Sequence, residues 1–397
     1  MSATTSDRPR LPVLTSVRFF AALWVALFHM QAMQAFAFSA SAVRRLASVG
    51  YSGVSFFFVL SGFILVYTYA GRLTTQRDFW QARFARIYPA LAFSLLITAP
   101  GFFFCCIRMR AHDPHLFVPE WSWAAQHLPL TILLSLTLLQ SWIPQTALAW
   151  NMPAWSLSVE AFFYFTFPFL LPRLSRLSRR NLLAILPLGC ALTLVCTLAY
   201  THLRPDGPDA ITFRTLGPWI NTLKFNPLVH LPEFLMGMAT GLVFLRTRPD
   251  QRAAWPLILS GLAAVAVVVS FAPHIPYLAI HTALLAPAFA VLITGLALQP
   301  AGLSLLKHPA METLGEASYP FYLLHSMLIG VFFLDFKTGI ARHQSPLGFA
   351  TWLLLSIAVA LLIDRLIERP LRRLLRPKPR PLAAPSPTTP LPVAAQA

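Results

Sequence analysis

The stretch LTSVRFFAALWVALFHM (residues 14–30) has the length and apolar composition of a membrane-spanning helix, yet it contains Arg18 and His29. An α-helix turns ~100° and rises ~1.5 Å per residue, so His29 returns to within about 20° of the face of Arg18, ~16 Å farther along. A charge near the bilayer centre costs about 2.5–3.5 kcal/mol on insertion scales, and such groups normally face a polar cavity. We therefore expect one polar stripe facing the interior of a bundle. The alternative is a snorkelling arginine and a polar histidine near the outer surface.

The rest of the chain has the composition of a polytopic membrane protein. Of its 397 residues, 56% are hydrophobic and only 11% are charged. Several apolar segments approach the roughly 20 residues that a helix needs to cross the hydrocarbon core. Eleven such segments lie at about 13–35, 50–70, 86–106, 127–142, 150–172, 182–201, 227–245, 255–272, 278–298, 314–334 and 347–367. The predicted fold class is an all-α bundle of transmembrane helices.

Clusters of basic residues predict the topology, because loops rich in Lys and Arg stay in the cytoplasm. Four clusters lie at 72–86, 173–180, 246–252 and 365–380. Placing all four inside requires an even number of crossings between neighbours, yet three apolar segments separate the first two. The segment 127–142 is short and has Pro129 and Pro144 near its ends, so we expect a re-entrant or interfacial helix on the outer side. About ten crossings remain, and both termini are then cytoplasmic.

This topology also explains the formal charge of +17, which would otherwise suggest nucleic-acid binding. Residues 1–375 are predicted to form one integral membrane domain. The Pro- and Ala-rich residues 376–397 are predicted to form a disordered cytoplasmic tail, because they cannot bury a core.

The four cysteines lack the spacing of a metal site, and we expect no metal. The oligomeric state stays open.

Acidic and polar side chains recur within the later apolar segments. Glu160 lies in the segment 150–172, with Ser156 one turn earlier on the same face. Each buried acid or histidine needs a polar partner, so we expect several of these residues to converge on one cavity. The further candidates for this cavity are Ser156, Glu233, Glu316, Tyr319 and His325. A proton-coupled transporter or flippase would also retain such groups, although no internal repeat supports that alternative.

Two arginines, Arg83 and Arg86, lie at i and i+3 at the expected cytoplasmic end of the third segment. Arginines at that level often only mark the cytoplasmic side. Two guanidiniums on one face are also well suited to bind the phosphates of an anionic cofactor.

Seven blocks of the sequence, in order, resemble the membrane-bound acyltransferase-3 family of O-antigen and polysaccharide O-acetylase-like proteins. VRFFAALWVALFHM resembles the R/K-x10-H signature that opens the family, with Arg18 and His29 at the required spacing. The resemblance covers about residues 11–373. The other blocks are GVSFFFVLSGFIL, RFARIYP, WSLSVEAFFY, PEFLMGMATG, SYPFYLLH and IERPLRR.

The resemblance implies a multi-pass enzyme of a bacterial inner (cytoplasmic) membrane. Its reaction would move an acyl group, usually acetyl, from cytoplasmic acyl-CoA to a hydroxyl of an exported carbohydrate or related acceptor. His29 would then be the general base, because imidazole titrates near neutral pH. Glu160 is the expected partner of His29. Arg18, Arg83 and Arg86 would bind the phosphates of the donor.

Overall fold

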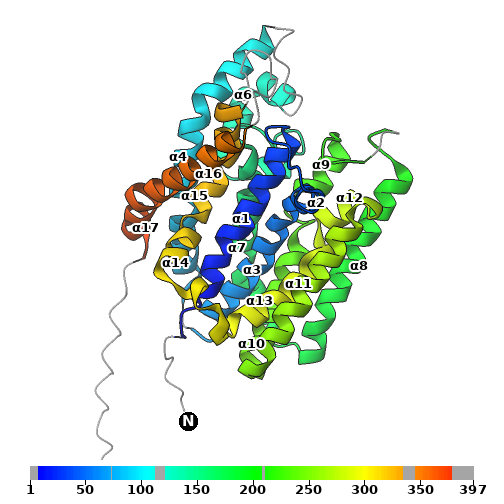
Figure 1. Cartoon of the computed structure of the whole chain (residues 1–397), viewed down its shortest axis with the longest axis vertical. Helices are drawn as coiled ribbons and strands as arrows, with labels where there is room; N and C mark the ends of the chain where they lie inside the picture. Colours follow the sequence, from blue (N-terminus) through cyan, green and yellow to red (C-terminus); the bar gives the residue numbers. More distant parts are fainter. Residues whose placement is uncertain (1–7, 73, 112–120, 208–210, 334–344, 378–397) are drawn as a thin grey trace, which may run out of the picture.

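The computed structural model describes residues 8–72, 74–111, 121–207, 211–333 and 345–377, and these residues form helices and turns without a strand (Figure 1). This confirms the predicted all-α class. The last described helix, α17, runs from Arg369 to Leu375, and the predicted domain boundary at residue 375 stays a prediction. The predicted tail, 376–397, lies almost entirely outside the described residues.

Seven helical segments in the described part of the chain are long and apolar enough to cross a membrane. Their main helices are α1 (Pro12–Ala32), α3 (Gly53–Tyr69), α4 (Gln76–Arg110), α7 (Trp155–Leu174), α8 (Arg179–Leu203), α11 (Ala254–Phe271) and α16 (Pro346–Ile363). Three more predicted crossings correspond to shorter helices, α10 (Leu231–Thr247), α13 (Ala286–Ala297) and α15 (Ser318–Phe333). The count of about ten crossings and the cytoplasmic termini stay predictions.

The remaining α-helices are short and connect or cover the long ones. They are α2 (Ser41–Ser48), α5 (Ser122–Gln126), α6 (Leu128–Leu136), α9 (Pro218–Phe225), α12 (Tyr277–His281) and α14 (Pro309–Glu316). Nine residues give α6 a length of only ~13 Å, whereas the hydrocarbon core is ~30 Å thick. α6 alone is therefore too short to cross, which agrees with the expectation for 127–142.

α8 and α11 lie along one edge of the bundle (Figure 1) and expose apolar side chains outward. Leu188, Val195 and Leu198 on α8 and Leu259 and Val267 on α11 are each more than half exposed. Apolar surface on this scale is typical of helices that face lipid.

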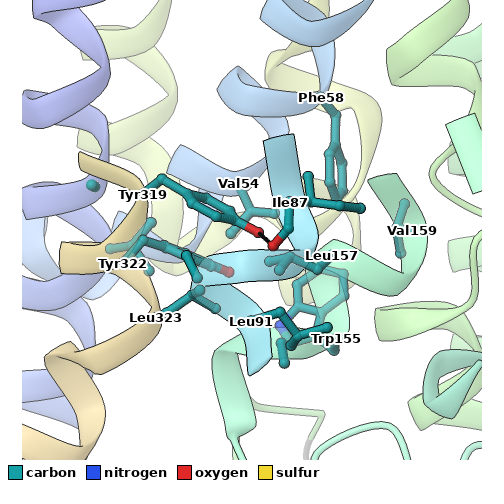
Figure 2. Packing of buried hydrophobic residues seen from close by; sticks show 14 of the residues in the cluster. Val54, Phe58, Ile87, Leu91, Trp155, Leu157, Val159, Tyr319, Tyr322 and Leu323 are labelled. Atoms are coloured by element: carbon teal, nitrogen blue, oxygen red, sulfur yellow. Dashed lines mark hydrogen bonds between the residues drawn. The ribbon is translucent and has the colours of Figure 1, made fainter. Parts of the chain in front are cut away.

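α1 lies inside the bundle, in contact with α3, α14 and α15 (Figure 1). Figure 2 shows two tyrosines of α15, Tyr319 and Tyr322, among apolar residues of α3, α4 and α7. The Tyr319 hydroxyl donates a hydrogen bond to the Ile87 carbonyl of α4 (2.8 Å), and Asn151 donates to the Leu323 carbonyl of α15 (3.1 Å). These bonds fix α15 against α4 and against the turn that precedes α7.

α3 and α10 pack backbone against backbone through glycines. Gly237 and Gly241 of α10 have the GxxxG spacing that lets helices in membranes approach closely. A Cβ atom added to Gly237 would lie 2.0 Å from the Val59 carbonyl oxygen of α3, and one added to Gly62 would lie 2.3 Å from the Phe234 oxygen of α10. Neither backbone can yield to a methyl group without separating the helices.

Gly237→Ala should therefore destabilise the protein by about 1–3 kcal/mol, the usual cost of overpacking, because its methyl group meets backbone atoms. Gly101→Ala is the matched control, since nothing lies within 4 Å of the added Cβ there. Thermal unfolding in detergent, followed by tryptophan fluorescence, would measure both variants. Equal unfolding temperatures for the two variants would contradict the proposed close contact.

Candidate functional site

A cavity of about 140 Å³ lies between α1, α3, α4, α7 and the first turns of α15. Apolar side chains of α3 form one wall, and charged and hydroxyl-bearing side chains converge on the others. Six residues singled out in the sequence line it, namely Arg18, Arg83, Arg86, Ser156, Glu160 and Tyr319. The structure thus brings the three arginines and Glu160, in the second turn of α7, to one cavity.

Glu160 is the carboxylate that lines the cavity. Its Oε1 atom accepts hydrogen bonds from the Tyr164 hydroxyl (2.5 Å) and from the Ser61 hydroxyl (3.4 Å). Tyr164 follows one turn later on α7, so the tyrosine and the acid share a face of the helix. Hydroxyl donors on one oxygen hold the carboxylate in place beside the guanidiniums.

The three arginines of the cavity differ in how they are held. Arg86 forms an ion pair with the buried Glu368. Arg83 donates to the Tyr69 hydroxyl (3.1 Å), and its guanidinium lies over the rings of Tyr69 and Tyr164 at 5.5 and 5.7 Å from their centres. Arg18 makes no hydrogen bond or ion pair with any residue that the structure describes. Arg18 and Arg83 therefore keep guanidinium donors that no carboxylate in the described part of the chain occupies.

Glu368 was not found from the sequence, although it lies in the IERPLRR block. It belongs to a π-helical turn, Asp364–Glu368, that follows α16 directly. Asp364 in the same turn accepts from Arg369 (2.7 Å). An acid within a run of arginines at the end of an apolar segment was the available signal, because an acid there needs a cationic partner.

Glu316 does not line the cavity. It pairs with Arg369 at 2.7 Å, and its side chain is 37% exposed. The structure therefore places this acid at the surface of α14, in an ion pair beside the C-terminal helix.

His29 lies against His325 of α15 and not against Glu160. Nδ1 of His29 is 3.1 Å from Nε2 of His325 and 3.0 Å from the Val25 carbonyl oxygen. Nδ1 of His325 is 2.5 Å from the Tyr322 carbonyl oxygen, and the His325 side chain is fully buried. The hydrogen-bond partner that the structure gives His29 thus differs from the one expected from the sequence.

Tyr322 links the histidine pair to the cavity. Its backbone carbonyl accepts from His325, its side chain lines the cavity, and its hydroxyl is 2.9 Å from the Ser156 hydroxyl. The two histidines themselves are not among the lining residues. The polar stripe of α1 therefore meets two neighbouring groups of residues. Arg18 lies among the other arginines of the cavity, and His29 lies beside His325.

Glu233 belongs to a separate buried cluster. Its Oε2 atom is 2.6 Å from Nδ1 of His230, whose Nε2 is 2.7 Å from the Lys224 carbonyl oxygen. The ring of Trp155 packs beside His230. These bonds give Glu233 a local partner outside the cavity.

Comparison with known proteins identifies the family. The model of the acyltransferase-3 family, described as "Acyltransferase domain", matches residues 12–365. "Acyltransferase MdmB" of Streptomyces mycarofaciens is 34% identical over 400 residues, which cover 96% of each chain. No solved structure matches. The chain belongs to this acyltransferase family and is an acyltransferase, so the transporter or flippase alternative loses its support.

Replacing Glu368 with Ala should leave Arg86 without its buried partner and destabilise the protein by about 3–5 kcal/mol. Glu316→Ala is the control, because an ion pair that is partly open to solvent contributes only about 0–1 kcal/mol. Thermal unfolding in detergent would compare the two variants with the wild type. A Glu368→Ala variant as stable as Glu316→Ala would show that the ion pair with Arg86 does not hold this end of the bundle.

Proposed function

We propose that this member of the acyltransferase family transfers an acyl group, in the first instance acetyl, from acyl-CoA to a hydroxyl of an exported carbohydrate or related acceptor. The observation that carries the proposal is the division of α1 between a cationic cavity at Arg18 and an imidazole at His29. Eleven residues of helix separate these two groups by ~16 Å. A donor with phosphates at one end and a thioester at the end of a long thin arm suits that arrangement.

The arginines support an anionic donor. Arg18 and Arg83 have guanidinium groups without a carboxylate partner among the described residues, and Arg86 is held beside them by Glu368. Guanidinium groups bind phosphate through paired, charge-assisted hydrogen bonds. Glu160 offsets part of the positive charge while the donor is absent. In this proposal Glu160 acts on the donor side of the site.

The transfer step needs a base and a place for the proton. The acceptor hydroxyl gives its proton to Nε2 of His29 while its oxygen forms a bond to the thioester carbonyl carbon. The carbon–sulfur bond then breaks, and the leaving thiolate of CoA takes the proton from Nε2. The products are an O-acyl ester and CoA as the free thiol, and His29 returns to its starting state. Direct attack by the acceptor hydroxyl accounts for all atoms without a covalent acyl-histidine.

His29→Ala should lower acyl transfer by about 10²–10⁴-fold, the usual contribution of a general base. Purified protein would be supplied with radiolabelled acetyl-CoA and an acceptor fraction, and both free CoA and labelled ester would be measured. His202→Ala, which removes an exposed imidazole at the end of α8, is the matched control. A His29→Ala variant that keeps more than about a tenth of the wild-type rate would remove His29 as the base.

Arg18→Gln and Arg83→Gln should each raise the KM for acetyl-CoA about 10–100-fold, the equivalent of losing one charge-assisted hydrogen bond. Neither should change the KM for an acetyl thioester that lacks the nucleotide. Arg180→Gln, which removes an exposed arginine at the start of α8, is the control. Equal losses with both donors would show that Arg18 and Arg83 support the fold and do not bind phosphate.

A further inference from the structure

We infer that His325 is a positioning residue that holds His29 in the tautomer whose Nε2 atom can accept a proton. The inference rests on the proposed function, because it assigns a role within the same transfer step. It follows from the hydrogen-bond geometry of the two imidazoles and the two backbone carbonyls beside them.

The first step is the protonation of His325. Its Nδ1 atom lies 2.5 Å from the Tyr322 carbonyl oxygen, which can only accept. Nδ1 of His325 therefore carries the hydrogen. A neutral imidazole has one N–H donor and one acceptor nitrogen, so Nε2 of His325 presents a lone pair. A doubly protonated ring is disfavoured here, because the side chain is fully buried and the structure describes no carboxylate against it.

The second step fixes the tautomer of His29. Its Nδ1 atom faces two acceptors, the Val25 carbonyl oxygen at 3.0 Å and Nε2 of His325 at 3.1 Å. The hydrogen of His29 must therefore lie on Nδ1, where it is shared between them. The other tautomer would set the lone pair of Nδ1 against two acceptors. The Nε2 atom of His29 is left unprotonated and forms no hydrogen bond with a described residue.

The hydrogen bond between the two histidines also stabilises His29 once it has taken up the proton. When Nε2 of His29 takes the hydroxyl proton, the ring becomes an imidazolium whose Nδ1–H points at the lone pair of His325. A hydrogen bond to a charged group is stronger than the same bond between neutral groups, so this contact strengthens as the charge develops. A base oriented by a third group is the usual arrangement in nucleophilic catalysis. Here a second imidazole, fixed by a backbone carbonyl, takes the place that a carboxylate often has.

Two amide substitutions separate the two contacts of His325. The amide of His325→Gln reaches about as far as Nε2 and can accept from His29, whereas the amide of His325→Asn lies at the level of Nδ1 and can donate only toward the Tyr322 carbonyl. His325→Leu removes both contacts. We expect kcat to fall about 10–100-fold in the Asn and Leu variants, the loss expected for one hydrogen bond to a charged group, with both KM values unchanged. The Gln variant should recover most of that loss.

The reverse order, with Asn more active than Gln, would overturn the inference, because His325 would then act only by holding the backbone of α15. A rise in KM for either substrate with kcat unchanged would overturn it as well. Thermal unfolding of each variant in detergent would separate a change in rate from a loss of folded protein. If Leu does not fold, the Gln and Asn pair still decides the question.

The His29→Ala background gives an independent test. His325→Leu should lower the residual rate no further in that background, because residues that act through one another are not additive. A further loss would overturn the inference. A wild-type protein that consumes no acyl-CoA would refute the proposed function itself. A wild-type enzyme that loses activity in His29→Ala but not in His325→Leu would refute only the role of His325.

Discussion

The structure depends on the cost of placing ionisable groups inside an apolar bundle, which is met by giving nearly every such group a specific partner. Arg86 is paired with Glu368, and Glu160 is held by hydroxyl groups. These partners come from α3, α7 and the turn after α16, so the polar interactions hold α3 against α7 and the turn after α16 against α4. Among the described residues, Arg18 makes no hydrogen bond or ion pair, and Nδ1 of the buried His281 has no hydrogen-bond partner either. In the proposed function, the guanidinium of Arg18 stabilises the negative charge of the donor.

The close contacts between helix backbones serve the same arrangement. Gly237 lets α10 lie directly against α3, which forms one wall of the cavity. Gly315 does the same for α14 and α1, since an added Cβ would lie 2.0 Å from the Thr15 carbonyl oxygen. The Tyr319 hydroxyl then joins α15 to α4. Small residues and single hydrogen bonds thus set the positions from which Arg18, His29 and His325 extend.

Much of the fold could be predicted from the sequence, and so could the convergence of the three arginines and Glu160 on one cavity, whereas the pairing within the site could not. Helical periodicity gives the direction of a side chain on its own helix, which is why Arg18 and Glu160 were expected to face the interior. It does not say which helix lies opposite, and His29 and His325 are 296 residues apart in the chain. Glu316 was expected in the cavity because it shares a segment with Tyr319, yet the break between α14 and α15 turns it toward Arg369. The position of Glu368 depends on a π-helical turn, which the helical periodicity of the sequence does not predict.

The rigid distance along α1 has a consequence for how this sequence can change over time. One residue inserted or deleted between Arg18 and His29 would turn the histidine by ~100° and remove it from His325, whereas an exchange of one apolar side chain for another leaves the geometry in place. The length of this interval is therefore far less free to vary than its composition. Most of the amino acids between Arg18 and His29 could be substituted during evolution while their number stays the same.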